Sequence, residues 1–354
     1  MGKMQSYGVA SLAVCSVYLA YVHIYCSHKL LKTKVLISDE LPSFWYLYIR
    51  YLTRALTRRS GHLHTATSTT TKTCEAVYTL LRCRLETPAL RRFCSDGGYG
   101  WDYPDTEYRD IPLCFPEFLC GRLLLMVLTD GNFRLSPAGL VRVSQSLKTF
   151  QPIDELKKGP FTLQVRVLVY RQTDAGVEVD ICLSATSRSG CLVWQSVLTL
   201  LSKNKLHRAS RDLTKTEDQS QPDEPAPENM KQVELRVPRS PSPQCVWSLS
   251  DCSLCRLLSL PARLFSRRSQ AAPGLWMLSV CLAEIEKHKG VEVITAPVNV
   301  TAQFKEPLSV PGKVMIRFWE MTENRGQASA QGLSFHMQQH GGNISHLVGL
   351  ISRS

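Results

Sequence analysis

The order of elements along residues 116–201 constrains the fold more than any other feature of this sequence. Pro116 to Thr129 is an apolar run that opens with Pro-Glu, which predicts a buried helix. Four strand-like segments follow it, and in one of them apolar and polar side chains alternate with the period of a half-buried strand. These segments are Leu140 to Thr149, Phe161 to Tyr170 (the alternating one), Val177 to Ser187 and Gly190 to Leu201. One apolar helix followed by an antiparallel meander predicts a sheet that wraps a central helix.

The same order returns after a polar gap. Arg211 to Gln232 holds six acids, three prolines and no aromatic residue, so it cannot bury enough apolar surface to fold alone. We interpret it as a linker between two halves of an α+β fold. The second half is expected to contain a strand, an apolar helix and a meander: Val233 to Val237, Leu275 to about Glu286, and then Glu292 to Lys305, Gly312 to Glu320, Ala328 to Gln338 and His346 to Ile351.

The stretch from Trp247 to Trp276 leads into the second apolar helix. Pro273 and Gly274 suit a helix start. The stretch resembles the active-site segment of the MaoC-like hydratases, the (R)-specific enoyl-CoA hydratases, which are hotdog proteins. The resemblance covers Asp110 to the C-terminus and implies a double hotdog. It is carried by Ala262-Arg263-Leu264-Phe265, Gly274-Leu275-Trp276, Phe304-Lys-Glu-Pro-Leu308, Pro311-Gly-Lys-Val314 and the run from Ile111 to Phe133.

The resemblance also implies where a site would lie. Counting back from Phe265 places Asp251 on the family's catalytic aspartate, Ser253 on its asparagine and Arg256 on its catalytic histidine. Pro273 stands where a second histidine is usual, and the amide of Gly274 would polarise the thioester carbonyl. Arginine stays protonated near neutral pH, so Arg256 cannot exchange a proton as histidine does. It would pair with Asp251 and lower the basicity of that carboxylate.

From these candidate site residues we expect an acyl-CoA or lipid-thioester binding protein with reduced or no hydratase activity. Asp251 is its one candidate catalytic residue, and Ser253, Arg256 and Gly274 are its candidate substrate-binding residues. The alternative is an active (R)-specific enoyl-CoA hydratase, or 3-hydroxyacyl thioester dehydratase, at a membrane surface. A scaffold with an empty tunnel is a third class. Whether the chain is an enzyme, a lyase by resemblance, stays open at this point.

The N-terminal segment reads as a membrane anchor. Gly8 to Cys26 contains no Asp, Glu, Lys or Arg, and it is about long enough to span a bilayer as a helix. We interpret it as an uncleaved transmembrane helix; a cleaved signal peptide is the rival, although only Lys3 precedes the run and no Ala-x-Ala site follows it. Three lysines follow the span: Lys29, Lys32 and Lys34. They place the bulk of a single-pass protein in the cytosol. The sequence does not indicate which organelle's membrane would hold the anchor.

Two further segments before residue 110 read as helices. Leu41 to Arg59 mixes aromatic residues with arginines at helical spacing. Two interpretations remain: a basic amphipathic helix on anionic headgroups, or a helix packed against the folded domains. No recognised nucleic-acid motif accompanies the net charge of +12, so no nucleic-acid partner is expected. Glu75 to Phe93 is expected to be helical as well.

The remaining reactive residues point to no cofactor. The thirteen cysteines are odd in number and scattered, which favours packed, reduced thiols over a secreted disulfide framework. Cys252 and Cys255 form one Cys-x-x-Cys without a second pair, so no metal site is expected. His336, His340 and His346 are read as packing or surface residues. A homodimer stays open. The expected organisation is 1–34 anchor, 35–109 juxtamembrane region, 110–205 first hotdog half, 206–232 linker and 233–354 second half.

Overall fold

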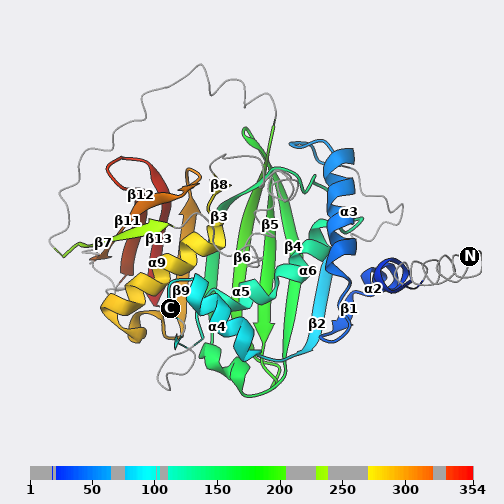
Figure 1. The fold of residues 1–354 in the computed structure, drawn as a ribbon, viewed down its shortest axis with the longest axis horizontal. Helices are drawn as coiled ribbons and strands as arrows, with labels where there is room; N and C mark the ends of the chain where they lie inside the picture. Colours follow the sequence, from blue (N-terminus) through cyan, green and yellow to red (C-terminus); the bar gives the residue numbers. More distant parts are fainter. Residues whose placement is uncertain are drawn as a thin grey trace, which may run out of the picture.

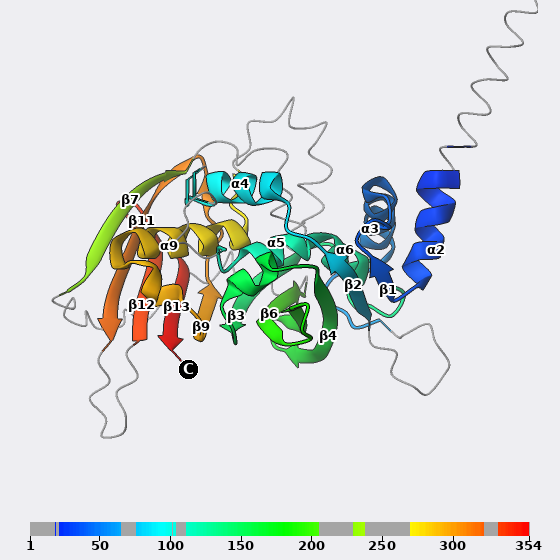
Figure 2. The ribbon, with the colours of Figure 1, turned by 90° about the horizontal axis from the view of Figure 1, so that it is seen from below.

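The computed structural model describes residues 18, 21–64, 76–100, 102–103, 111–204, 229–237, 270–321 and 332–353. Its centre is one eleven-stranded sheet in the order β1-β2-β4-β5-β6-β3-β9-β13-β12-β11-β7 (Figure 1). Neighbouring strands are antiparallel except β1 (Val35–Ile37) and β2 (Val77–Cys83), which pair in parallel. The helices within residues 115–128 and the helix over residues 274–289 lie on one face of this sheet (Figure 2).

The first half has the predicted helix and meander. α5 (Phe115–Leu119) and α6 (Gly121–Leu128) occupy the run expected to be one helix, with a short break at Cys120. The side chains from Leu123 to Leu128 are all buried because α6 packs between α3 and the sheet. The four predicted strands are confirmed as β3 (Leu140–Thr149), β4 (Phe161–Thr173), β5 (Gly176–Thr186) and β6 (Leu192–Lys203).

The second half repeats this plan around α9 (Gly274–Lys289). Every residue of α9 from Gly274 to Glu286 is buried. The helix lies against the sheet, and the end of α4 (Thr87–Asp96) lies beside it, where the carbonyl of Asp96 accepts a hydrogen bond from Trp276 Nε1 at 2.9 Å. A helix buried on most of its surface needs no polar face. Its strands are β7 (Lys231–Val237), β9 (Val298–Phe304), β11 (Gly312–Met321), β12 (Gly332–Gln339) and β13 (Ser345–Arg353), and a separate pair is formed by β8 (Gln270–Ala271) and β10 (Ser309–Val310).

The two halves share one sheet through β3 and β9. These strands pair antiparallel from Ser144 opposite Gln303 to Thr149 opposite Val298. On either side of this seam the strand order is the same: β2-β4-β5-β6-β3 in one half and β7-β11-β12-β13-β9 in the other. The predicted α+β fold with two hotdog halves is therefore confirmed, but the halves share one continuous sheet instead of forming two separate sheets.

The helix predicted over Glu75 to Phe93 is wrong in its first part. This segment holds the strand β2 followed by α4, which begins after Glu86 with a proline in its first turn. Tyr78 and Leu80 are buried while Val77 and Thr79 are less so, a period of two that fits a strand. β2 pairs with β4, with Tyr78 opposite Val165, and so extends the sheet of the first half.

The predicted transmembrane helix over Gly8–Cys26 is not supported. None of the helices in the described ranges combines the length and the apolar character needed to cross a membrane, and the single-pass membrane localisation inferred from that helix is corrected with it. Residues 8–17, 19 and 20 of the predicted span lie outside the described residues. From Tyr21 the chain forms the short π-helix η1 (Tyr21–Cys26) and then the polar helix α2 (Ser27–Lys32). His23 Nδ1 lies 3.0 Å from Ser43 Oγ, a contact within the protein.

The arginine-rich helix is confirmed as α3 (Phe44–Thr57). Arg54 donates to the carbonyl of Asp130, and Arg58 to the carbonyls of Phe133 and Leu135. Burial, followed by repulsion from Arg58, lowers the pKa of Arg54 to about 10. Both guanidinium groups thus bind the loop that follows α6, as expected for a helix packed against the folded domains.

Candidate functional site

The start of α9 lies at the seam between the two halves. Pro273 precedes the helix in extended backbone and Gly274 is its first residue, as predicted. The first turn of an α-helix directs amide hydrogens out of its end and carries a partial positive charge. The approach to this turn is fixed by the β8–β10 pair and by the amide of Ala272, which donates to the carbonyl of Leu308 at 2.7 Å. The start of α9 is therefore the positive end of a helix dipole at a buried position.

A close approach of two side chains favours glycine at position 274. A Cβ there would lie 3.0 Å from Arg142 Cδ and 3.0 Å from Phe304 Cε1. Arg142 belongs to β3 of the first half and Phe304 to β9 of the second. The guanidinium carbon of Arg142 lies 5.6 Å from the centre of the Phe304 ring, a favourable cation–aromatic contact. Both halves therefore contribute side chains to the start of α9.

A buried polar network holds Arg142 in place. Its Nη2 lies 2.7 Å from Glu117 Oε1, and its Nη1 donates to Gln145 Oε1 at 2.9 Å. Gln145 Nε2 in turn donates to Glu117 Oε2 at 2.6 Å and to Ser196 Oγ at 3.0 Å. A buried charge pair persists when further hydrogen bonds satisfy it. Sequence reasoning missed these residues, because β3 also contains Ser144, Gln145, Ser146, Lys148 and Thr149 and one buried arginine does not stand out among them.

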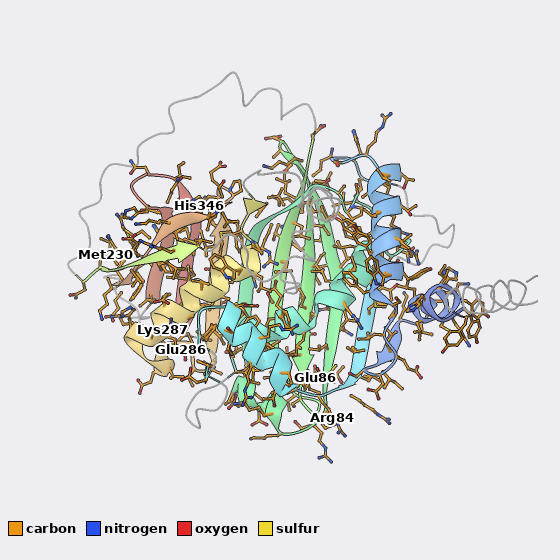
Figure 3. The ribbon with its side chains drawn as sticks, viewed as in Figure 1. Arg84, Glu86, Met230, Glu286, Lys287 and His346 are labelled. Atoms are coloured by element: carbon orange, nitrogen blue, oxygen red, sulfur yellow. The ribbon has the colours of Figure 1, made fainter. Side chains whose placement is uncertain are left out.

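His346 lies at the end of the second-half sheet where α9 begins (Figure 3). It is 3% exposed. It occupies a bulge of β13, because Leu347 and Ser345 face Met337 and Gln338 while His346 has no residue opposite it on β12. Its Nδ1 lies 3.0 Å from the carbonyl oxygen of Glu306. Its Nε2 is covered by protein and has no hydrogen-bond partner among the described residues.

The other two histidines of the last strands have ordinary surroundings. The His336 ring packs edge-on against Trp319, with centroids 4.7 Å apart, and burial followed by the charge of Arg317 lowers its pKa. His340 lies in a turn beside the exposed Glu234, with the two groups 4.0 Å apart. Neither contact suggests a role beyond packing or surface charge.

Of the predicted site residues, the structure places Gly274 alone. Asp251, Ser253 and Arg256 lie outside the described residues, as do Cys252 and Cys255. Within the described ranges no group of three or more His, Cys, Asp or Glu side chains could hold a metal ion. Burial raises the pKa of the Cys114 and Cys281 thiols well above their usual range, so these groups stay protonated and are poor nucleophiles.

A surface pocket of about 330 Å³ lies beyond the other end of α9. It is lined by Glu292, Thr295, Ala296, Pro297 and Arg353. The sixteen residues of α9 separate it from Gly274, about 24 Å at the rise of an α-helix. This pocket therefore belongs to a different region from the site at the helix start.

No protein-family model matches the chain, and no curated protein matches its sequence. Solved structures do match its fold. HtdX of Mycobacterium tuberculosis aligns with a TM-score of 0.55 at 16% identity, over 78% of this chain and 98% of the other. A MaoC-like dehydratase from Phytophthora capsici aligns with a TM-score of 0.54 at 16% identity, over 79% and 95%.

A third match is to a longer protein. The peroxisomal multifunctional enzyme type 2 of Drosophila melanogaster aligns with a TM-score of 0.53 at 14% identity, over 78% of this chain but only 48% of the enzyme. At such identities the likeness is one of fold. The chain has the double-hotdog fold of the MaoC-like dehydratases, which confirms the expected resemblance.

Proposed function

We propose that this protein binds an acyl-CoA or a related lipid thioester at the start of α9, and that hydration by the family's usual aspartate–histidine mechanism is reduced or absent. The observation that carries the proposal is the helix end at Gly274, buried between Arg142 and Phe304 at the seam of the two halves. The shared fold supports it, since MaoC-like dehydratases are among the structural matches.

The electrostatics of this helix end suit a neutral carbonyl better than an anion. Arg142 is paired with Glu117, so the network adds little net charge. The partial positive charge at the helix end remains, and it can orient a carbonyl dipole. Burying a neutral carbonyl oxygen also costs far less than burying a carboxylate. A thioester has such a carbonyl, and its alkyl chain matches the apolar interior around α9.

Low turnover is proposed from the sequence. Hydration needs a base that holds water and a group that delivers a proton to the α-carbon. The resemblance places Arg256 where the family has its catalytic histidine, and a guanidinium group stays protonated. Asp251 then lacks the histidine with which it would share these two tasks. Binding without rapid turnover follows.

Calorimetry on the full chain tests the proposal. We expect CoA esters with acyl chains of graded length to bind more tightly than CoA itself. Gly274→Val should weaken this binding at least tenfold, because its side chain would displace Arg142 and Phe304. Gly342→Val is the matched control, since a Cβ at Gly342 meets nothing within 4 Å.

A hydration assay on crotonyl-CoA and longer enoyl-CoAs completes the test. Little or no hydration is expected. Failure of every acyl-CoA to bind would overturn the proposal. Robust hydration that Asp251→Ala abolishes would instead establish the alternative, an active hydratase or dehydratase.

A further inference from the structure

We propose that the outward face of α3 docks the folded protein onto the headgroup layer of an anionic phospholipid bilayer. The docking surface consists of Trp45, Ile49 and Leu56, and the neighbouring η1 and α2 flank it. This proposal is independent of the function proposed for the start of α9. It concerns a part of the chain that the family resemblance leaves unexplained.

Exposed apolar side chains gather in the N-terminal part of the chain. Ten of the nineteen large apolar side chains that are exposed in the described residues lie between Tyr18 and Leu63. On α3, Trp45 is 64% exposed, Ile49 56% and Leu56 75%. Single exposed apolar residues are normal on a protein surface, whereas a group of them marks a place where a partner or a membrane binds. The outward face of α3 therefore calls for an occupant.

The docking surface is one stripe along α3. Its three residues are separated by four and seven positions, which places them on the same side of a helix. Leu47 and Tyr51 are fully buried, and each follows a residue of the stripe by two positions, a rotation of about 200°. Arg54 and Arg58 continue the buried side and bind the loop after α6. The inner face of α3 thus attaches the helix to the protein and leaves the apolar stripe outward.

η1 and α2 lie beside the first turn of α3 (Figures 1 and 2). His28 Nδ1 lies 2.8 Å from the hydroxyl oxygen of Tyr46, which connects α2 to α3. Tyr21 and Tyr25 of η1 are exposed, and their rings stack with centroids 5.5 Å apart. Tyrosine and tryptophan rings are typical of the boundary between lipid headgroups and acyl chains. These tyrosines and Trp45 therefore suit that boundary.

The charge of this region indicates which kind of surface it binds. Residues 21–64 contain seven lysines and arginines and only two acids, Asp39 and Glu40. Lys29 and Lys32 of α2 are exposed beside α3. Basic residues close to an anionic bilayer strengthen binding to it, whereas two copies of this chain would bring like charges together. An apolar stripe with basic neighbours is the pattern of a helix that lies in the lipid interface.

Docking of this kind involves no membrane-spanning helix. α3 has fourteen residues, and no helix within the described ranges is long and apolar enough to cross a membrane. A helix that lies in the plane of the interface needs one apolar face only. Its other face stays packed on the protein, as the contacts of Arg54 and Arg58 require. The corrected transmembrane helix therefore plays no part in the docking.

Vesicle sedimentation with the full chain tests the proposal. The native protein should bind vesicles of phosphatidylcholine with phosphatidylserine at least about tenfold more tightly than vesicles of phosphatidylcholine alone. The triple change Trp45→Ser, Ile49→Ser and Leu56→Ser should weaken binding to the anionic vesicles about tenfold or more, because the apolar area that enters the bilayer is lost. Lys29→Gln with Lys32→Gln should reduce the preference for anionic vesicles about fivefold or more.

A matched control changes exposed apolar residues elsewhere on the protein. Phe150→Ser, Met321→Ser and Ile344→Ser together remove side chains of similar exposure and should leave vesicle binding as it is in the native protein. A spectroscopic measurement then locates the contact. Lipids with brominated acyl chains should quench the tryptophan fluorescence of the native protein on anionic vesicles. Trp45→Phe should bind these vesicles still, and most of the quenching should be lost.

Several results would overturn the proposal. Native protein that binds neither kind of vesicle would leave the stripe to a protein partner, and equal affinity for both kinds would remove the role of the charge. A folded triple variant that binds as the native protein does, or quenching that persists in Trp45→Phe, would assign the contact to another part of the chain. A native dimer that the triple change converts to a monomer in analytical ultracentrifugation would assign the stripe to a second copy. Thermal melts identify variants that do not fold, and the Trp45→Phe and lysine variants then decide.

Discussion

Arg142 of β3 and Glu117 of α5 form an ion pair in which Nη2 and Oε1 are 2.7 Å apart and each side chain is 2% exposed. The pair joins the central helix of the first half to its strand at the seam. The aliphatic part of Arg142 also lies close to the first residue of α9, since a Cβ added to Gly274 would be 3.0 Å from Arg142 Cδ. A charge pair within one half thereby supports the helix start of the other half.

Breaking this pair should destabilise the protein strongly. Arg142→Met removes the guanidinium that pairs with the buried Glu117 carboxylate, so we expect the free energy of unfolding to fall by about 3–5 kcal/mol. The double change Arg142→Met with Glu117→Gln should recover much of the loss. Denaturant unfolding measures both. The exposed pair Lys158–Glu155 is the control, where Lys158→Met should cost at most about 1 kcal/mol. Equal losses at the two pairs would contradict the argument.

Adding one methyl group at the start of α9 should also be costly. In Gly274→Ala the new Cβ meets Arg142 and Phe304 at 3.0 Å, and overpacking of this kind costs about 1–3 kcal/mol. The same change at Gly342 meets open space and should stay within about 0.5 kcal/mol. Denaturant midpoints of the two variants should differ accordingly. A Gly274→Ala protein as stable as the native one would show that the neighbours move aside freely.

Tyr78 should make the fold sensitive to alkali. Its one hydroxyl hydrogen is shared between Asp130 Oδ2 and the carbonyl oxygen of Leu31. Burial, and then the charge of Asp130, raises its pKa well above the ordinary value of 10.0. A raised pKa in the folded state means that its contribution is fully present below pH 10 and is lost as the pH rises further.

Tyr78→Phe tests this expectation. It should lower stability at pH 7 by about 1–3 kcal/mol through the lost hydrogen bonds, and stability should then decline less above pH 10. Unfolding curves at several pH values measure both effects. Tyr25→Phe changes an exposed ring and should alter neither. An unchanged alkaline decline in Tyr78→Phe would assign that decline to other groups.

Cysteine labelling should follow burial. Burial raises the pKa of Cys94 to about 12 and that of Cys83 to about 11, whereas Cys191 is exposed. Because the thiolate is the reactive form, brief iodoacetamide treatment at pH 8 should modify Cys191 and spare the other two. Peptide mass spectrometry gives the extent of reaction at each position. Labelling of Cys94 at the rate of Cys191 in the native protein would show that this thiol is accessible.

The fold was largely predictable because its signals are local. The alternation along Phe161 to Tyr170 and the apolar run after Pro116 each describe one element facing one core, and both were confirmed. β2 was missed because only three residues separate it from α4, whose Leu90 continues the run of leucines that begins in the strand. The transmembrane helix was predicted wrongly, because a run without charged residues does not by itself distinguish a membrane-spanning helix from a segment that packs against protein.

The site was less predictable because it depends on contacts between distant residues. Gly274 carried a local helix-start signal and does begin α9, while its role in binding stays a prediction. Glu117 and Arg142 are far apart in sequence and on different elements, so no spacing rule connects them. His346 owes its orientation to a bulge whose cause is the register between β12 and β13, which one strand's sequence does not encode.

The seam between β3 and β9 has a consequence for how the protein can be divided. An isolated half would end in a long strand with unpaired amide and carbonyl groups, and such an edge invites aggregation. Expressed alone, either half should therefore be poorly soluble. Expressed together as separate chains, the two should recombine, because the main-chain bonds from Ser144–Gln303 to Thr149–Val298 do not need a covalent link. Each half would then protect the edge strand of the other half from aggregation.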